Sequence, residues 1–387
     1  MTVTDWDPYA PEAAADPPAS WAELRGQCPV AWTERMGGFW AVSRFDDVVS
    51  IARASDRFNN SGGPQFGTSR PPLEVDRPEH TFFRRVLQPY FANERVAQLE
   101  PAIRGFVGEM LEPALEAGQA DLAEVLSYPL PARTLCLWLG LPDREWSYVK
   151  GVAEKLFDAE EGRGDDPLTR AACNEELYAY SRQLVRERME HPLDPEVDLI
   201  TGILGQADGT HTVTEELCVQ VVRLLLAAGH NSTTSGIGNA LLRIASEPDV
   251  QRRLREEPAL IPTAIEEFLR LETPVQGMPR WANEDLELHG REIREGEMLM
   301  LLWASANRDP ERFPEPDRCV LDRSPNEHVT FGRGIHRCIG MDLARLELRV
   351  AIEELLARTE WVELAGEPVR TTFIRLGVSY LPVRLHT

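Results

Sequence analysis

Paired cysteines, basic charge and long hydrophobic runs are all scarce in this sequence of 387 residues. No run of apolar residues, such as Leu224 to Ala228, approaches the roughly 18 that a membrane-spanning helix needs. Asp and Glu total 63 against 41 Lys and Arg, which gives a formal net charge of −22. This acidic balance argues against a nucleic-acid-binding protein and against adhesion to an anionic membrane.

None of the six cysteines forms a Cys-x-x-Cys pair, which excludes a zinc ribbon and implies no disulfide framework. Residues 1–20 are acidic and rich in Pro and Ala, and they lack the basic start and apolar run of a signal peptide. We therefore expect residues 1–20 to form a loose leader. We also expect a cytoplasmic protein in a reducing compartment.

The spacing of apolar residues predicts a mainly α fold with a small β-rich region. Up to about residue 271 the pattern is mostly helical, apart from a short hairpin expected around Gly37 and Gly38. The longest helical pattern covers the segment 212–246, in which Thr214 is the expected helix start. Beyond residue 271 we expect short strands at 280–282, 286–293 and 298–303, followed by a Pro-rich irregular stretch. A final helix over 339–357 and closing strands complete the expected fold.

Small and hydroxyl side chains interrupt the Leu- and Ala-rich middle of the longest predicted helix at residues 229–234, which read Gly-His-Asn-Ser-Thr-Thr. Such residues weaken a buried helix and often mark a bulge at a functional site. The sequence therefore predicts a bulge in this helix.

The segment 331–340 is the most informative part of the chain. Its glycines permit the close approach of a flat ligand, and Cys338 directly precedes a predicted helix. The positive end of a helix dipole favours the thiolate form, which binds metal. His336 and Arg337 beside it are candidate anion binders. On this chemistry alone, a buried structural cysteine after a turn is an equally good interpretation.

The full string Phe331-Gly332-x-Gly334-x-His336-x-Cys338-x-Gly340, preceded by His328, resembles the haem-binding loop of soluble bacterial cytochromes P450. The resemblance implies that Cys338 is the axial thiolate ligand of a haem b iron, and that Phe331, Gly332 and Gly340 belong to the cofactor site. It extends from about residue 28 to the end, and it implies a single haem-thiolate monooxygenase domain over residues 21–387. This fold has a long central helix and a small β-rich lobe. The other five cysteines are expected to be packing residues.

Two further motifs follow the family's order. Glu267 and Arg270 match its Glu-x-x-Arg pair, which is structural and supports the haem loop. Four other residues match positions that bind the haem propionates, namely His80, Arg84, Arg280 and His336. His80 and Arg84 share one helix face, so both can reach one carboxylate. Outside this family context, the pair would be an ordinary solvated basic turn.

The segment 228–234 resembles the family's oxygen-activation motif, Ala-Gly-x-Asp/Glu-Thr-Thr. We prefer the register that places Asn231 at the acid position and Ser232 at the first threonine position, with Thr233 assisting. In the family, acid and alcohol help to deliver protons to iron-bound dioxygen. Asn231 supplies no proton by titration, so water, substrate or another route has to do so. Anchoring a polar substrate atom and bonding to the backbone are the other interpretations of Asn231. His230 occupies a variable position and receives no role.

The resemblance also implies a hydrophobic small-molecule substrate, O2, and electrons from NAD(P)H. A reductase would pass the electrons through a ferredoxin or flavodoxin-like partner. Candidate substrate contacts form an apolar set: Phe66, Leu224, Ala228, Val275, Met278 and Ile374. Residues 62–64 and 162–166 are candidate lid elements. Arginines near the cysteine are a candidate patch for an acidic electron donor, namely Arg84, Arg85, Arg333, Arg337, Arg345 and Arg349. Ordinary surface arginines are an equally good interpretation of this set.

The expected reaction is insertion of one oxygen atom by hydroxylation, epoxidation or O-dealkylation. The departure at Asn231 and Ser232 leaves an H2O2-using peroxygenase as an alternative. A non-catalytic haem-binding sensor is a second alternative, and the apolar candidate pocket weighs against it.

Overall fold

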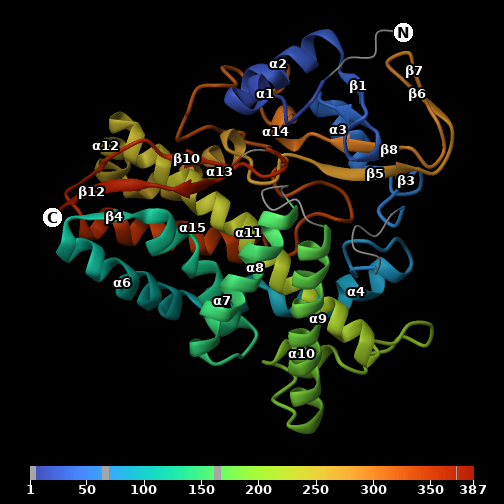
Figure 1. Cartoon of the computed structure of the whole chain (residues 1–387), viewed down its shortest axis with the longest axis horizontal. Coiled ribbons are helices and arrows are strands. Elements are labelled where there is room, and N and C mark those ends of the chain that lie inside the picture. The colour runs from blue at the N-terminus through green and yellow to red at the C-terminus, as the bar shows by residue number, and fades with distance from the viewer. Residues whose placement is uncertain (1–5, 63–68, 161–166, 372) are drawn as a thin grey trace.

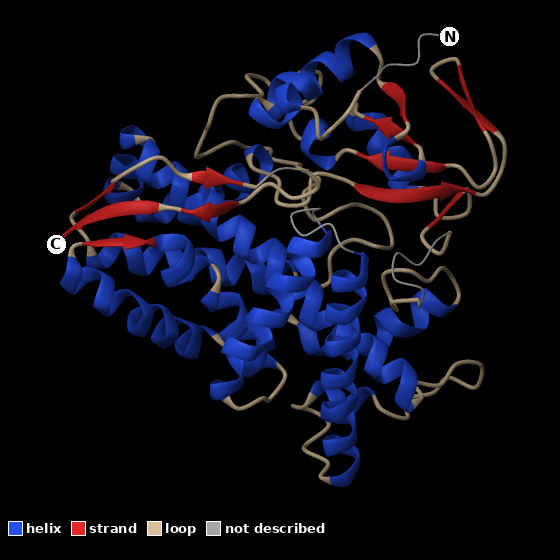
Figure 2. Cartoon of the chain, viewed as in Figure 1, coloured by secondary structure: helices blue, strands red, loops and turns tan. Residues whose placement is uncertain are grey.

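The computed structural model describes residues 6–62, 69–160, 167–371 and 373–387. Helices make up its larger part, and strands gather in a lobe at the N-terminal side and in a separate sheet near the C-terminus (Figures 1 and 2). In the described residues, no helix combines the length and the apolarity needed to cross a bilayer.

The helix α11 (Glu215–Ser246) runs through the middle of the molecule (Figure 1). Among the helices that pack directly on it are α7 (Pro129–Trp138), α8 (Trp146–Glu160), α9 (Pro167–Glu190) and α15 (Met341–Arg358). The remaining helices of this layer are α4 (Glu79–Leu87), α5 (Asn93–Ala97), α6 (Glu100–Ala117), α10 (Leu199–Ile203), α12 (Pro248–Glu256) and α13 (Ile261–Leu271). The main hydrophobic core lies between these helices.

Helix α11 confirms the long helix expected over residues 212–246. Thr214 caps its start by accepting a hydrogen bond from the Leu217 N–H at 3.3 Å, and Pro248 begins the next helix. The predicted bulge is wrong, because the helix remains α-helical through residues 229–234. Two of the hydroxyl groups bond to carbonyls one turn back, Ser232 to Ala228 at 3.2 Å and Thr234 to His230 at 3.0 Å. They are satisfied without opening the helix.

The β-rich lobe contains a five-stranded sheet in the order β1-β2-β8-β5-β3. Its strands are β1 (Val30–Thr33), β2 (Phe39–Val42), β8 (Met298–Leu301), β5 (Met278–Ala282) and β3 (Phe58–Asn59). Strands β1 and β2 form the predicted hairpin, in which Trp32 pairs with Trp40, and β2 runs parallel to β8. The helices α3 (Phe45–Arg53) and α14 (Trp303–Ala306) share this lobe's core.

Smaller strand groups complete the chain. Strands β6 (Leu286–Leu288) and β7 (Arg291–Ile293) form a hairpin, and β10 (Val369–Arg370) pairs with β11 (Val378–Tyr380). A C-terminal sheet has the order β4-β12-β9, with β4 at Gln119–Asp121, β12 at Pro382–His386 and β9 at Trp361–Leu364. The strand predicted over 298–303 ends at Leu301, because the chain turns into α14.

Part of the segment expected to be a loose leader is folded. The helices α1 (Pro11–Ala15) and α2 (Pro17–Gln27) begin within it. The Trp6 ring packs edge-on against Phe39 and Phe373, with centroids 6.5 and 6.3 Å away, and its Nε1–H donates to Ser20. The composition of residues 1–20 hides this contact because one large aromatic side chain is enough to dock the segment.

A carboxyl group lies inside the helical core. Glu347 on α15 is only 2% exposed, and its Oε2 has no hydrogen-bond partner in the described part of the chain. Burial raises the pKa of Glu347 to about 8, and the Thr134 hydroxyl opposes only part of this shift. The folded protein therefore holds Glu347 protonated at neutral pH.

We expect Glu347→Gln to stabilise the protein above pH 5. Because the folded-state pKa is raised from 4.5, the carboxyl contribution to stability is complete below pH 4.5 and is lost as pH rises toward 8. The loss is at most about 1.4 kcal/mol per pH unit. Chemical unfolding between pH 5 and 9 measures it, with exposed Glu360→Gln as the control. A constant difference between the variant and the parent across this range would contradict the prediction.

Candidate functional site

The loop that carries Cys338 is shaped by two glycines in left-handed conformations. Gly332 has φ 71° and Gly334 has φ 73°. A Cβ atom on Gly334 would lie 2.1 Å from the Ala52 carbonyl oxygen of α3, so the loop presses against that helix and no larger residue fits. The Cys338 N–H donates to the Phe331 carbonyl at 2.8 Å and closes the loop. The sequence therefore fixes the backbone that presents the thiol.

Cys338 is the accessible thiol of the chain, whereas four of the other cysteines are buried and Cys319 is half-buried. It lies just before α15, whose N-cap is Gly340. Protein atoms enclose the thiol on its other sides and raise its pKa, while the Gly340 N–H and the Arg84 guanidinium oppose part of this shift. Phe331 is half-buried beside the loop, with the Arg345 guanidinium 4.7 Å from its ring centre.

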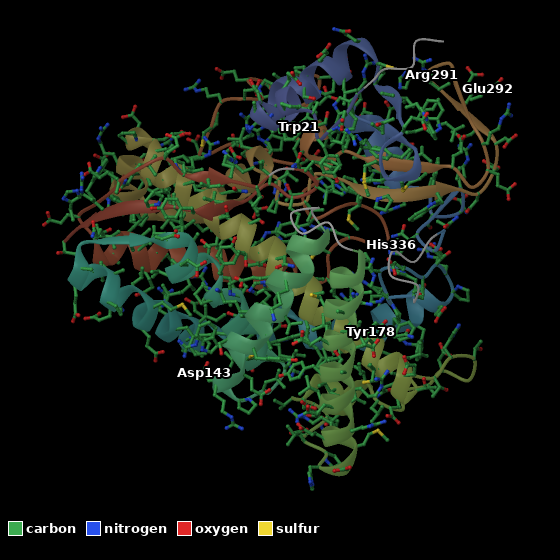
Figure 3. The ribbon with its side chains drawn as sticks, viewed as in Figure 1. Trp21, Asp143, Tyr178, Arg291, Glu292 and His336 are labelled. Carbon is green, nitrogen blue, oxygen red and sulfur yellow. The ribbon has the colours of Figure 1, made fainter. Side chains whose placement is uncertain are left out.

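Four basic side chains from separate elements gather near this loop: His80 and Arg84 on α4, Arg280 on β5, and His336. The rings of His80 and His336 have centroids 4.3 Å apart. Arg84 donates to the Arg337 carbonyl at 3.0 Å. In Figure 3, His336 lies between the β-rich lobe and the helical layer. The structure thus brings together all four residues predicted to bind propionates.

These basic groups are poorly satisfied by the protein itself. In the described residues, both ring nitrogens of His80 and Nε2 of His336 are buried without a hydrogen-bond partner. The carboxylate of Asp76 lies 3.8 Å from His336 Nε2, which is too far for a hydrogen bond. Burial, aided by His336 and Arg84, lowers the pKa of His80 to about 3, and burial lowers the pKa of Arg280 to about 10. Such a cluster fits a buried dianionic group, as the two propionates of haem are.

The donor set around Cys338 also fits a porphyrin iron. In the described ranges, no three His, Cys, Asp or Glu side chains group as a metal site of their own. A metal held here through one thiolate needs its other ligands from outside the protein, and a porphyrin supplies four of them; haem iron in P450 enzymes takes one protein thiolate.

Glu267 and Arg270 lie apart from this cluster, in the interior of α13. Both are fully buried, and their two hydrogen bonds are each 2.8 Å long. Arg270 also donates to the carbonyls of Asn307, Pro316 and Arg318, and Glu267 accepts from the Val320 N–H and from the side chains of Arg323 and Asn326. Burial alone would raise the pKa of Glu267, but Arg270 and these other donors lower it. The pair therefore holds the irregular chain that leads to the cysteine loop.

The residues of the predicted oxygen-activation motif on α11 differ in how far their side chains are exposed. Ala228 is exposed and Ser232 is half-buried, one turn apart on one face, whereas Asn231 and Thr233 are 7% and 6% exposed. His230, to which sequence reasoning gave no role, is fully buried and contacts Asn231. The one signal for His230 in the sequence was an ionisable side chain in the middle of an apolar helix.

The predicted substrate contacts are divided among several elements. Leu224 is buried on α11, while Val275, Met278 and Ile374 are half-buried. Met278 and Ile374 pack against two separate clusters of the β-rich lobe. Residues 274–276 and 374–376 lie side by side, because the Gln276 N–H donates to the Ile374 carbonyl at 3.0 Å and Val275 bridges to Arg375. Phe66 and both candidate lid segments lie wholly or partly outside the described residues.

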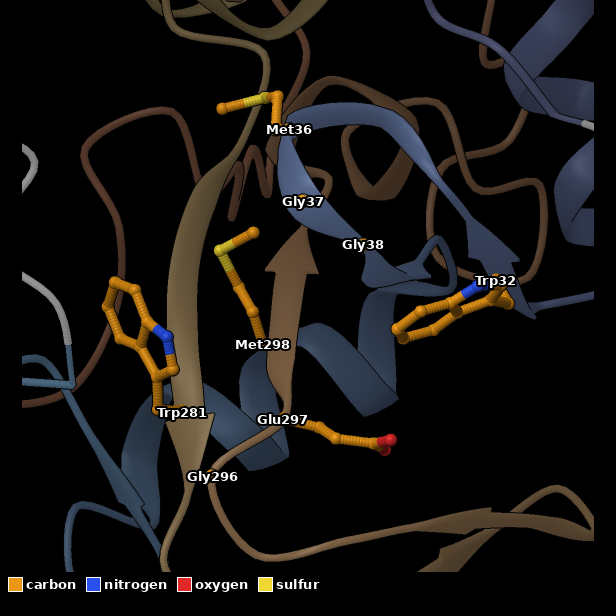
Figure 4. Close-up of a pocket in the computed structure, with 8 residues that line it drawn as sticks. All are labelled: Trp32, Met36, Gly37, Gly38, Trp281, Gly296, Glu297 and Met298. Atoms are coloured by element: carbon orange, nitrogen blue, oxygen red, sulfur yellow. The ribbon is translucent and has the colours of Figure 1, made fainter.

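A pocket of about 450 Å³ opens elsewhere, between the β1–β2 turn and strands β5 and β8 (Figure 4). It is lined by Trp32, Met36, Trp281 and Met298, together with glycines and Glu297. Trp281 follows Arg280 in β5, and successive side chains of a strand point to opposite faces. This pocket therefore lies on the other face of the sheet from the basic cluster. It is separate from the candidate site around Cys338.

Comparisons with known proteins agree with this geometry. A family model described as Cytochrome P450 matches residues 170–386. The mycinamicin IV hydroxylase/epoxidase of Micromonospora griseorubida is 33% identical over 338 residues, which cover 84% of this chain and 83% of that protein. The vitamin D(3) 25-hydroxylase of Pseudonocardia autotrophica is 33% identical over 386 residues, covering 96% and 94%.

A solved structure has the same fold. Cytochrome P450 CYP109Q5 from Chondromyces apiculatus superposes with a TM-score of 0.89 at 32% identity, covering 100% of this chain and 99% of that one. This similarity confirms the mainly α fold with its long central helix and small β-rich lobe. With the thiol loop, the basic cluster and this family coverage taken together, the chain belongs to the cytochrome P450 family of haem-thiolate monooxygenases.

Proposed function

We propose that this monooxygenase inserts one oxygen atom from O2 into a hydrophobic small molecule held against the Ala228 face of α11. The observation that carries the proposal is the accessibility of Ala228 in the middle of an otherwise buried helix. Its small apolar side chain leaves room for a ligand beside Leu224, where apolar contact favours an apolar substrate. Val275, Met278 and Ile374 are the proposed walls opposite the helix.

The chain's own residues hold the cofactor and move protons. Haem, when bound, supplies the iron at which O2 is activated. Cys338 would bind that iron, Phe331, Gly332 and Gly340 would shape its loop, and the basic cluster would hold the propionates. We assign Ser232 and Asn231, with Thr233, to hydrogen bonding of the water that delivers protons beside the substrate.

The substrate proposal is tested by filling the space next to Ala228. We expect Ala228→Phe to abolish substrate-induced spin-state shifts across a library of hydrophobic compounds, because the added ring occupies the binding space. The reduced CO-bound spectrum should stay that of a thiolate-ligated haem. Ala22→Phe, on an exposed position of α2, is the matched control. Unchanged shifts in Ala228→Phe would overturn the substrate position.

A peroxygenase that uses H2O2 is the second candidate function, because the neutral Asn231 stands where the family's motif has an acid. Product formed with H2O2 alone is to be compared with product formed with O2, NAD(P)H and a reductase system. We expect the reductase system to give the faster reaction, and faster turnover with H2O2 alone would favour the peroxygenase.

We further propose that a ferredoxin or flavodoxin-like donor docks beside the cysteine loop, at Arg333, Arg337 and Arg53. Half of the six arginines predicted to form this patch are paired with carboxylates: Arg345 with Glu266 and Asp342, Arg349 with Glu100 and Glu353, and Arg85 with Asp208. In contrast, burial and the neighbouring Arg337, Arg53 and Arg312 lower the pKa of Arg333. This concentration of like charge favours an acidic donor. We place the protein in the cytoplasm, consistent with six free cysteines.

Reversing charge in this patch should slow electron entry. We expect Arg333→Glu to lower the rate of first-electron transfer from an acidic ferredoxin about tenfold at low salt, because electrostatic steering is lost. Arg85→Glu, which replaces an arginine already paired with Asp208, is the control and should have a much smaller effect. Stopped-flow reduction under CO measures both, and equal effects of the two variants would contradict this docking site.

A further inference from the structure

His230 joins α11 to a neighbouring part of the core. Its Nε2 lies 3.0 Å from the carbonyl oxygen of Tyr128, which separates the π-helical turn at Ala123–Ser127 from α7. Its Nδ1 lies 2.8 Å from Oδ1 of the adjacent Asn231. The imidazole is therefore held at both nitrogens, and one of its contacts is the side chain at the acid position of the motif.

The number and position of the protons on the His230 ring determine the orientation of the Asn231 amide. Full burial lowers the pKa of His230, and the contacts with Asn231 and Tyr128 oppose only part of this shift, so the ring is neutral and carries one N–H. The Tyr128 carbonyl can only accept a hydrogen bond, so that proton is on Nε2. Nδ1 then needs a donor. A 180° rotation of the amide about Cβ–Cγ exchanges its oxygen and nitrogen and supplies one.

We propose that His230 is a positioning residue that fixes the Asn231 amide, with its NH2 group toward Nδ1 and its carbonyl oxygen on the opposite side. The inference rests on the proposed function, in which Asn231 helps to place the water that delivers protons. A fixed carbonyl oxygen only accepts, so it orients a water or a hydroxyl by taking one of its hydrogens. Without Nδ1 of His230, the amide loses the acceptor that distinguishes its nitrogen from its oxygen, and the water loses part of its defined direction.

The tautomer is tested on the intact holoenzyme. Histidine is labelled with ¹⁵N, and the diamagnetic ferrous–CO form is measured by NMR at pH 7.5, with His230→Gln identifying the resonances. We expect a neutral ring protonated at Nε2. A ring protonated at Nδ1, or protonated at both nitrogens, would overturn the amide orientation. This measurement needs no turnover, so it stands even if the proposed substrate class is wrong.

The positioning role is tested by a double-mutant cycle that uses His230→Gln and Asn231→Ala. His230→Gln keeps a donor toward the Tyr128 carbonyl but removes Nδ1. We expect it to split or broaden the infrared C–O stretching band of the CO complex and to raise the share of electrons lost as H2O2.

In the Asn231→Ala background, the same His230 change should have no further effect on either readout. Thr234→Val, which removes a hydroxyl bonded to the His230 carbonyl, is the control and should leave the band unchanged. Equal effects of His230→Gln in both backgrounds, or an unchanged band in the single variant, would show that His230 is only a packing residue.

Discussion

Replacing Cys338 by alanine is expected to abolish the thiolate-type band of the reduced CO-bound spectrum, and monooxygenase turnover with it. Cys338 is the accessible thiol, and the described residues offer no other metal-binding cluster to replace it. Without the thiolate, the electron density that favours O–O cleavage is lost, even if the basic cluster still retains some haem. The measurement is the difference spectrum of the reduced protein with and without CO.

Cys319→Ala is the matched control for this variant. Cys319 is half-buried and lies outside the glycine loop of segment 331–340, and burial raises the pKa of its thiol to about 11. We expect this control to keep both the band and the activity. Far-ultraviolet circular dichroism of Cys338→Ala distinguishes a lost ligand from a lost fold. Survival of the thiolate band in Cys338→Ala would refute the assignment.

Removing Arg270 is expected to cause the largest loss of stability, about 3–5 kcal/mol in the free energy of unfolding. Arg270→Ala leaves the Glu267 carboxylate fully buried without its principal partner. It also leaves the carbonyls of Asn307 and Pro316 without their donor. Because these carbonyls belong to the chain that leads to the cysteine loop, haem should also be released faster.

Arg294→Ala is the control for this prediction. Arg294 pairs with Asp285 at 3.0 Å, but both side chains are about 60% exposed, at 59% and 62%. Water and salt screen such a pair, so its removal should change stability little. Denaturant unfolding of the two variants, together with the rate of haem transfer to a scavenger protein, measures the difference. Similarly small losses of unfolding free energy in both variants would contradict the prediction, because the buried pair would then stabilise the protein no more than the exposed one.

The sequence alone was sufficient for the features that local chain chemistry governs. The glycines of segment 331–340 determine where the backbone can turn, and Cys338 follows them directly. Thr214 and Pro248 mark the two ends of α11 because capping and the missing proline N–H act over a few residues. The hairpin at Gly37 and Gly38 is local in the same way. These features are enough to indicate the family and its thiolate ligand.

Only the tertiary structure decided how side chains far apart in sequence are paired and buried. It buried Glu347 in the core, and it neutralised Arg345 with Glu266 and Arg85 with Asp208, which reduced the predicted basic patch. It also joined His230 to Tyr128, 102 positions earlier in the chain. The physical reason is that charge and polarity in a sequence do not specify a partner. Packing selects the partner, and burial then determines how strongly that contact shifts a pKa or fixes an orientation.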